Sequence, residues 1–368
     1  MPETRTSVTV NGSPLSPHDL DLIQTLSLEE TLGGQDKVSI TIQLVTSDNS
    51  GWTSSLDPLV APAMPFHVTL TRGPDTVEVE ARSVSASWQI SPGGLSTITI
   101  EGMDRSVELD RRDVQRLWQD TTDAAIAETL FTEHGLAAQI DNTPSGANSD
   151  TYSPQQSGTD WAFLKGLAGR NGFDLHIASI SGVVTGVFKK IDANAAPQAR
   201  LTLGYGALGG AATASVQLLA GQEVHVTRTV PGSSDVDTAS DDGRGHAMGT
   251  RSLGGGTVVR TNTAGSVSVL DAQATATAMA ERSAFGATLN ATLASADAPL
   301  VRARRTVTVA GLGEALDGLW LVRSVRHTIT PGGHSQALGL VRNALGDPAA
   351  SGAGGLAGAV SAAVGVSL

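Results

Sequence analysis

The sequence has no cysteine, few aromatic residues and little charge for its length. Among its 368 residues there is no Cys, and only 4% are aromatic and 16% are charged. The lack of cysteine excludes disulfide frameworks, thiolate zinc sites and cysteine nucleophiles. Because aromatic rings are scarce, Val, Leu, Ile and Ala must fill most of the core. Hydrophobic residues still make up 40% of the chain, which is enough for a sizeable core.

Two further absences limit the classes of function. No stretch reaches the ~18–20 consecutive apolar residues that span a bilayer, and the first ten residues lack the pattern of a secretory signal. The formal net charge is −12, which disfavours binding to nucleic acid or to an anionic membrane surface. We therefore expect a protein that is made in the cytoplasm, binds no nucleic acid and does not insert into a membrane.

Glycine is abundant, and it separates short segments of alternating polar and apolar residues. The chain contains 42 Gly, and Asn11-Gly12 and Gly33-Gly34 are typical turn pairs between such segments. Regular short strands with this punctuation are typical of sandwiches and barrels. The pattern predicts an antiparallel β-barrel domain over residues 1–110.

The pattern changes in residues 111–199, where helices alternate with strands. One predicted helix ends near Gly135. A second helix has Thr159 or Asp160 as its cap and ends at Gly172, after which a strand follows. This stretch is predicted to be an α/β insertion region.

Strand patterns return in residues 200–345 and predict a second β-barrel domain. An Ala-rich helical pattern runs from about Asp271 to Leu293. Residues 231–256 are rich in Gly, Ser and Asp and are predicted to form a long exposed loop. Residues 346–368 are predicted to be a flexible Gly/Ala tail, or one that only a partner orders. The expected fold class is α+β, mainly β, with two antiparallel β-barrel domains and an α/β insertion between them.

One glycine-rich segment raises the possibility of a cofactor site. Gly204 to Gly209 matches the pattern GxGxxG after a predicted strand. A dinucleotide site would also need βα alternation and an acidic residue that closes the next strand. Glu223 precedes its strand instead, and the alternation is missing. The sequence therefore favours a glycine-rich turn.

Other polar clusters favour structural roles. The acidic residues of the 231–256 loop lack the spacing of a calcium loop, and the histidines lack metal-binding spacing; these are Asp235, Asp237, Asp241 and Asp242, and His67, His176, His225 and His327. A third group is interpreted as solvated charges at strand edges, with interface contacts as the alternative; it comprises Arg302, Arg304, Arg305, Lys189 and Lys190. No nucleophile elbow and no carboxylate pair stands out. The sequence predicts no catalytic, cofactor-binding or metal site, and no enzyme.

Three stretches, taken in order over residues 5–345, resemble one family. They are Gly102-Met103-Asp104-Arg105-Ser106 with the following helix; Asp160-Trp161-Ala162-Phe163-Leu164 with Gly172-Phe173; and Leu203-Gly204-Tyr205-Gly206 with Leu316-Asp317-Gly318, Trp320-Leu321-Val322, Val325-Arg326-His327 and Gly332-Gly333. The chain resembles the phage late control protein D family. These are baseplate hub proteins of contractile tails, related to the N-terminal half of type VI secretion spike proteins (VgrG). Thr159-Asp160 stands where the family usually has Ser-Asp.

The resemblance implies a structural function. Hub proteins of this kind carry two β-barrel domains and assemble as homotrimers, so that six barrels adapt a trimeric spike to a hexameric tail tube. The expected partners are therefore the chain itself, the spike, the first tail-tube ring and other baseplate components of a phage tail or phage-like contractile injection system. Because the OB-fold and β-helix of type VI spikes are missing, we expect the spike to be a separate protein.

On this hypothesis the 231–256 loop and the tail from Gly346 are candidate contacts with neighbouring subunits. The residues that match the family motifs are expected to pack rather than to bind ligands; these are Trp161, Phe163, Trp320 and His327. Two alternatives stay open. One is a monomeric β-rich surface-binding or adhesin module. The other is a nucleotide-dependent enzyme that uses the Gly204–Gly209 turn, whose cofactor would raise its melting temperature.

Overall fold

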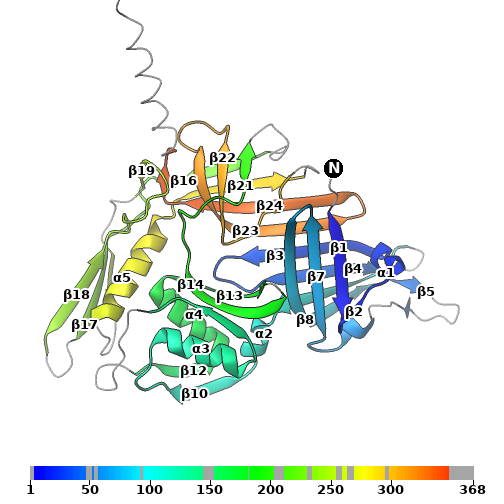
Figure 1. The fold of residues 1–368 in the computed structure, drawn as a ribbon, viewed down its shortest axis with the longest axis horizontal. Coiled ribbons are helices and arrows are strands. Elements are labelled where there is room, and N and C mark those ends of the chain that lie inside the picture. The colour runs from blue at the N-terminus through cyan, green and yellow to red at the C-terminus, as the bar shows by residue number, and fades with distance from the viewer. Residues whose placement is uncertain are drawn as a thin grey trace, which may run out of the picture.

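The largest element of the fold is one sheet that contains strands from both ends of the chain (Figure 1). The structure is a computed structural model, and it describes residues 4–46, 52–53, 57–91, 94–143, 153–180, 182–202, 211–229, 234–253, 259–262, 269–294 and 298–347. The sheet has 13 strands, in the order β16-β21-β24-β23-β3-β4-β9-β8-β7-β1-β2, with β22 and β15 attached beside β23.

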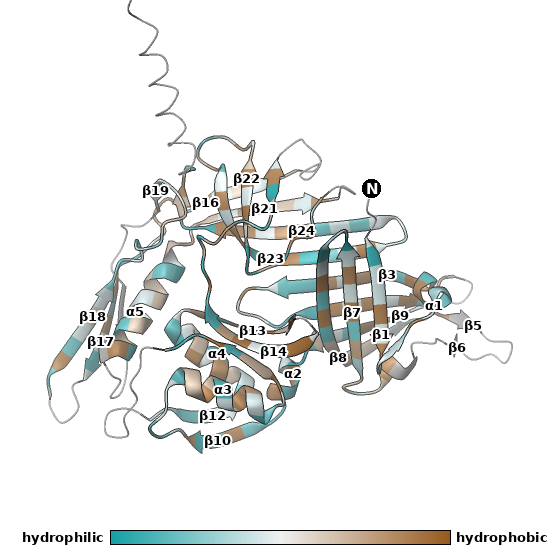
Figure 2. Ribbon diagram, viewed as in Figure 1, coloured by the Kyte–Doolittle hydropathy of each residue, from teal (hydrophilic) through white to brown (hydrophobic). Residues whose placement is uncertain are grey.

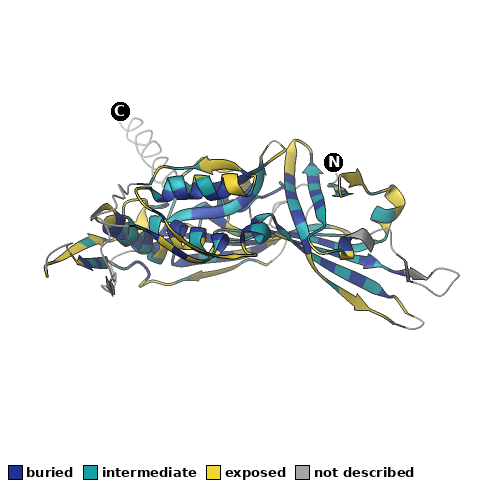
Figure 3. Ribbon diagram, turned by 90° about the horizontal axis from the view of Figure 1, so that it is seen from below, coloured by how far each residue is buried: buried dark blue, intermediate teal, exposed yellow. Residues whose placement is uncertain are grey.

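The first part of this sheet is an antiparallel group built around one core. Its strands are β1 (Arg5–Val10), β2 (Ser13–Pro14), β3 (Ile23–Thr31), β4 (Lys37–Gln43), β7 (Pro65–Arg72), β8 (Asp75–Gln89) and β9 (Thr97–Asp104). Alternate residues along these strands are buried, which appears as dark blue bands in Figure 3. Asn11 and Gly12 both have positive φ, so they form the tight turn between β1 and β2 that the sequence predicts.

Shorter elements decorate this first part. They are α1 (Pro17–Asp21), β5 (Val45–Thr46), β6 (Trp52–Thr53) and the 3₁₀ helix η1 (Asp57–Val60). The sequence interpretation did not include α1. Its signal is a capping box, in which the Ser16 hydroxyl accepts from the Asp19 N–H and the Asp19 carboxylate accepts from the Ser16 N–H.

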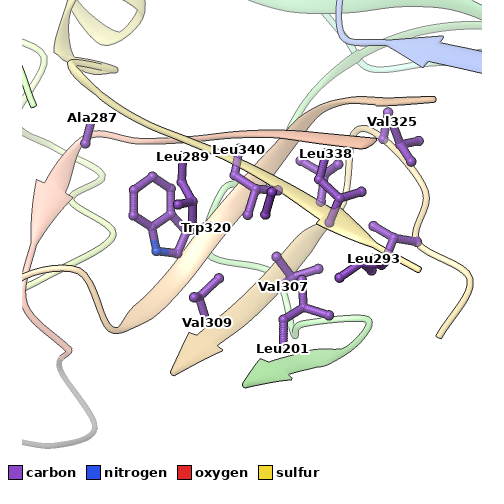
Figure 4. Packing of buried hydrophobic residues seen from close by; sticks show 14 of the residues in the cluster. Leu201, Ala287, Leu289, Leu293, Val307, Val309, Trp320, Val325, Leu338 and Leu340 are labelled. Atoms are coloured by element: carbon purple, nitrogen blue, oxygen red, sulfur yellow. The ribbon is translucent and has the colours of Figure 1, made fainter. Parts of the chain in front are cut away.

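The last part of the sheet surrounds a second core. Its strands are β15 (Arg200–Thr202), β16 (Thr213–Val216), β21 (Ala287–Leu293), β22 (Thr306–Ala310), β23 (Gly318–Thr330) and β24 (Gly333–Arg342). Figure 4 shows the Trp320 ring among aliphatic side chains of these strands, including Leu289 and Leu340. Trp320 is fully buried, and its ring N–H donates to the Leu316 carbonyl at 2.9 Å, so its polar atom has a partner.

Strands β3 and β23 join the two parts. They pair antiparallel from Ser324 opposite Thr31 to Ile329 opposite Leu26. A β-bulge between Val322 and Ser324 marks the change of partner: before it β23 pairs with β22, and after it with β3. The mainly β fold class is confirmed. Because β3 pairs with β23, the two predicted barrel regions share one sheet. Within the described residues, β2 and β16 are the two ends of this sheet and do not pair with each other.

The α/β insertion lies below this sheet in Figure 1. Its elements are α2 (Ser106–Leu109), β10 (Asp113–Leu117), α3 (Asp123–Glu133), β11 (Ala137–Ile140), β12 (Gln155–Thr159), α4 (Asp160–Asn171), β13 (Phe173–Ile180) and β14 (Val183–Lys190). The predicted ends of α4 are confirmed: the Thr159 hydroxyl accepts from the Ala162 N–H at 3.2 Å, and Gly172 ends the helix with φ 68°. Figure 2 shows apolar residues on α3, α4 and the facing strands, where a third core forms.

Helix α5 (Val269–Ala284) packs on a small outer sheet of β17 (Val224–Thr229), β18 (Val236–Asp241) and β20 (Val259–Asn262). The last two strands, β19 (Arg251–Ser252) and β25 (Ala344–Leu345), pair with each other. No helix in the described part of the chain is long and apolar enough to cross a membrane.

Two predictions fail in this region. The helix predicted from Asp271 to Leu293 ends at Ala284, and the remainder is strand β21. Gly286 lies against Ala220, so close that a Cβ there would overlap it, and β21 pairs with both β16 and β24. Tertiary pairing therefore overrides the helix propensity of the Ala-rich run.

The prediction of a loop at residues 231–256 is wrong in its described part, although most of the residues in its strands are exposed as predicted. Strand β18 lies within it and pairs with β17 over six residue pairs. A polar sequence is tolerated there because β18 is an edge strand with most of its side chains in solvent. The predicted domain boundaries stay predictions.

Candidate functional site

A cluster of buried charges lies where the first part of the sheet, the insertion and the last part meet. We call it the ion cluster; it comprises Glu30, Asp36, Asp104, Asp174, Arg302 and Arg304. Its two arginines come from the segment that leads into β22, and its acids come from β3, the β3–β4 turn, β9 and β13. Residues far apart in sequence therefore converge because β3 and β23 are neighbours.

Arg304 contacts all three regions of the fold. Its guanidinium lies 2.7 Å from an Asp36 carboxylate oxygen and donates to the Thr31 carbonyl at 2.7 Å, and its Nε lies 3.4 Å from Asp174. The backbone of Arg304 is left-handed, with φ 67°. This conformation costs a non-glycine residue about 1 kcal/mol or more, so the surrounding contacts must hold it in place.

Glu30 and Arg302 form the second pair of the cluster. The Arg302 guanidinium donates twice to the same carboxylate oxygen of Glu30, at 2.6 and 2.9 Å, and the other oxygen accepts from the Ala303 N–H at 3.0 Å. Burial alone would raise the pKa of Glu30, but attraction and hydrogen bonding from Arg302 lower it to about 2. Glu30 is therefore ionised at neutral pH, and its oxygens have partners.

The cluster holds four carboxylates and two guanidiniums, and the excess of acid shows in the pKa values. Burial raises the pKa of Asp36 to about 6. Attraction to Arg304 lowers this pKa, but repulsion from Glu30 and Asp104 offsets part of that lowering. Burial also raises the pKa of Asp104, which accepts from the N–H groups of Asp36 and Ser106. Buried carboxylates without a cation of their own are costly to ionise.

Asp174 connects the insertion to this cluster. One of its oxygens accepts from the Gly33 N–H at 2.6 Å, and the other lies 2.6 Å from Nδ1 of His176. Burial would raise the pKa of Asp174, but His176 and Arg304 hold it below its usual value. The carboxylate therefore links β13 to the β3–β4 turn.

A histidine pair extends the cluster along the β23–β24 hairpin. Nδ1 of His327 lies 3.2 Å from Nε2 of His334, and Arg72 of β7 donates to Nδ1 of His334 at 2.8 Å. An arginine can only donate, so His334 carries its proton on Nε2 and donates it to His327. Burial lowers the pKa of His327 to about 4, and burial with repulsion from His327 and Arg72 lowers that of His334 to about 3. Both rings are neutral at physiological pH.

The ion pairs of this cluster stabilise the contacts between three regions of the fold. Glu30, Asp36 and Asp174 have side chains at most 3% exposed, and a buried charge that loses its partner is strongly destabilising. Among the described residues, no group of three or more His, Asp or Glu side chains could hold a metal ion. The ion cluster thus fixes three regions of the chain relative to one another.

The interpretation of the basic residues at 302–305 is corrected by these contacts. Arg302 and Arg304 were predicted to be solvated edge charges, but both form ion pairs with buried carboxylates, Arg302 half-buried and Arg304 with a side chain only 8% exposed, and of the three arginines only Arg305 is exposed. Their acidic partners lie more than 120 residues away in sequence, so no local spacing reveals them. Lys189 and Lys190 lie at the end of β14, which is the central strand of its three-stranded sheet and not an edge strand, and they pair with Asp141 and Glu281.

Of the acidic residues predicted to be solvated, Asp235, Asp237 and Asp242 are exposed and Asp241 is half-buried, and Asp237 and Asp241 contact side chains of other elements. Asp237 lies 2.8 Å from the Arg228 guanidinium, and Asp241 accepts from the Thr277 hydroxyl of α5 at 2.7 Å. Glu223, the candidate ribose ligand, is exposed and lies 3.0 Å from Nε2 of His225. The Gly204–Gly209 turn and the tail beyond Asp347 lie outside the described residues.

The four motif residues occupy positions that fit the predicted packing roles. Trp161 and Phe163 contribute to the core of the insertion, Trp320 to the core of the last part, and His327 is fully buried. Sequence reasoning missed the His327–His334 contact, although the two residues are seven apart on either side of a Gly332-Gly333 turn. The hairpin pairs His327 with Gln336 and His334 with Ile329, so the two rings are diagonal neighbours across β23 and β24. That the chain has no catalytic, cofactor or metal site stays a prediction.

One family model matches more than half of the chain. The family model described as phage tail baseplate hub (GPD) matches residues 87–333. A search of curated proteins finds no match. The fold is similar to the 43 kDa tail protein of prophage MuSo2 from Shewanella oneidensis, with a TM-score of 0.66 at 13% identity, covering 93% of this chain and 100% of that one.

Two further solved structures share the fold. The tail protein of Neisseria meningitidis MC58 has a TM-score of 0.66 at 16% identity, covering 93% of this chain and 97% of that chain. An Escherichia coli component of the type VI secretion system has a TM-score of 0.57 at 12% identity, covering 91% and 76%. The matched family segment runs from the end of β8 to the β23–β24 turn and so includes the insertion and the ion-cluster arginines. The chain belongs to the phage tail baseplate hub (GPD) family.

Proposed function

We propose that this baseplate hub protein joins a trimeric spike to the hexameric inner tube of a contractile phage tail or phage-like injection system. It acts as a homotrimer that contacts the spike, the first tube ring and other baseplate components, and it is assembled in the cytoplasm. The observation that carries this proposal is the pairing of β3 with β23, which makes one sheet from the two strand-rich parts of the chain.

A connector between spike and tube must transmit force without letting its parts rotate against each other. Two strand-rich parts joined only by loops would move separately. Here six residue pairs between β3 and β23, together with the ion cluster, hold both parts as one body. Three chains supply six strand-rich parts, a number that suits a hexameric ring, since closed symmetric assemblies repeat the same contacts around one axis.

The exposed end of the β8–β9 hairpin is the surface that we assign to contacts between subunits. Trp88, Ile90 and Leu95 are about half exposed, at 52%, 47% and 53%. Three large apolar side chains at one hairpin end are typical of a surface that a partner covers. The 231–256 segment, whose described strand β18 is an exposed edge strand, stays a second candidate for such contacts.

The proposal is tested by capture of partners during co-expression. The tagged spike protein of the same tail is expected to retain the wild-type chain in a one-to-one ratio of polypeptides, together with the tube protein. The Trp88→Asp/Ile90→Asp variant should lose this retention, whereas Leu117→Asp, which alters a side chain 55% exposed on β10, should keep it. If the spike retains none of the wild-type chain, the proposed function is wrong.

A further inference from the structure

A groove opens beside the ion cluster, at the junction of three regions of the fold. Its volume is about 560 Å³, and it is lined by the β3–β4 turn, α4, the start of β13, α5 and the middle of β23. We call it the three-way groove. A volume in this range accommodates several side chains of a bound ligand or peptide.

The floor of the three-way groove is apolar and only partly covered. Leu321 and Val341 form its buried base, and Leu32, Ile191 and Phe285 pack against them while remaining half-buried. Phe173 also lines it, so two of the six phenylalanines of this chain face one opening. Large apolar side chains gathered in a concave surface are typical of a binding site.

Helix α4 leaves space on the side of the groove. Gly169 lines it, and a Cβ at this position would meet nothing within 4 Å. Glycine inside a helix costs about 1 kcal/mol relative to alanine; the Arg282 guanidinium donates to the Gly169 carbonyl at 2.6 Å, but no atom near the Cβ position requires a glycine. The helix therefore leaves open a volume that any larger side chain would occupy.

The rim of the groove is basic, in contrast to the chain as a whole. Four basic side chains line it, and two acidic ones, in a protein whose formal net charge is −12; the basic residues are Lys165, Lys190, Arg282 and Arg323. Of the acids, Asp174 belongs to the ion cluster and Glu281 lies 2.8 Å from Lys190. Lys165 and Arg323 are exposed, and neither forms an ion pair with any residue that the structure describes. These two cations are available to a ligand.

We propose that the three-way groove binds a peptide segment of a partner protein that carries acidic residues beside one or two large apolar side chains. The apolar side chains enter between Phe173 and Phe285, and the carboxylates pair with Lys165 and Arg323. Ion pairs at the rim increase the specificity and the rate of association, while burial of the apolar side chains on the floor supplies most of the affinity. Such a segment would contact all three regions of the fold at once. The site is separate from the β8–β9 hairpin, so it does not depend on the proposed trimer contact.

The test is selection from a random peptide library on the immobilised full chain. Peptides retained by the wild type should be enriched in Asp and Glu together with Phe, Leu or Trp. Their binding should weaken about tenfold or more, or ~1.4 kcal/mol, in Lys165→Glu/Arg323→Glu. The matched control Arg111→Glu/Arg112→Glu makes the same change of charge at two exposed residues outside the groove and should leave binding unchanged.

A second variant tests whether the peptide occupies the groove itself, without a change in charge. Gly169→Phe fills the groove without altering its charge and should abolish binding, with circular dichroism showing that the fold is kept. If no peptide is enriched, if the enriched peptides are basic or uncharged, or if they bind Gly169→Phe equally well, the proposal is wrong. Enriched peptides that match a stretch of this chain would assign the groove to a second copy and overturn the partner assignment.

Discussion

At the scale of single residues, Arg304 has the most demanding position in the fold. It has a left-handed backbone, a side chain that is 8% exposed, and contacts to Asp36 and Asp174 from two other regions. Burial would lower its pKa, but these two carboxylates raise it above the usual arginine value. Arg304 therefore stays charged, and removing that charge leaves two buried acids without their main cation.

Replacement of Arg304 should be among the most destabilising single changes in the chain. Arg304→Gln is expected to lower the free energy of unfolding by about 3–5 kcal/mol, the range for one partner lost from a buried ion pair. The exposed neighbour supplies the control, since Arg305→Gln should change it by less than about 0.5 kcal/mol. Urea unfolding followed by circular dichroism measures both. Equal effects of the two substitutions would show that the ion cluster does not hold the fold together.

His327 should make the protein less stable as the pH falls below about 6.5. Its folded pKa is about 4, below the ordinary 6.5, so the unfolded chain binds the proton more readily. The free energy of unfolding is unaffected above pH ~6.5 and falls as the pH drops from there towards ~4, by about 3 kcal/mol for this group. Glu30 opposes the shift in pKa, and Arg302 and Arg72 add to it.

The His327→Gln variant isolates this dependence. Its free energy of unfolding should fall less steeply than that of the wild type over pH ~6.5 to ~4, while the two proteins keep a constant difference above that range. Urea titrations at several pH values measure the slopes, and His18→Gln, at an exposed position, should follow the wild type. Parallel slopes for wild type and His327→Gln would contradict the role assigned to this ring.

At the scale of elements, two glycines of the insertion differ sharply in their surroundings. Gly186 in β14 lies against Phe131 of α3, so that any Cβ would overlap the ring. Gly166 in α4 has open space where its Cβ would be, with nothing within 4 Å. One glycine is required by close packing of a helix on a sheet, and the other is not.

Alanine at these two positions should therefore have opposite effects. Gly186→Ala is expected to lower the free energy of unfolding by about 1–3 kcal/mol through overpacking. Gly166→Ala should raise it by about 0.5–1 kcal/mol through helix propensity. The denaturant midpoints of the two variants, compared with that of the wild type, measure both changes. A stable Gly186→Ala variant would mean that α3 does not pack on β14 as described.

Elements with strong local signals could be predicted from sequence, and those set by distant partners could not. Thr159 and Gly172 mark the two ends of α4, and Asn11-Gly12 marks a tight turn, because capping and turn chemistry act within a few residues. Strand β18 and the end of α5 were mispredicted because sheet pairing decides them. The ion cluster was missed for the same reason: Glu30 and Arg302 meet only once β3 lies beside β23.

At the scale of the whole molecule, the strand patterns predicted the mainly β class and the order of family motifs predicted the hub family, and both predictions are confirmed. The sharing of one sheet by both strand-rich parts was not predicted, since a 13-stranded path across the chain leaves no local trace in sequence. That shared sheet joins the two strand-rich parts by backbone pairing, and it underlies the proposed role as a connector between spike and tube.

The most direct test of this role is the absolute mass of the full chain in solution, measured by light scattering after size-exclusion chromatography, alone and co-expressed with its spike. We expect three chains per particle, and three chains with three spike polypeptides in the complex. Leu117→Asp should keep this mass, and Trp88→Asp/Ile90→Asp should give single chains. A wild-type chain that stays a monomer in the presence of its spike would show that the proposed function is wrong.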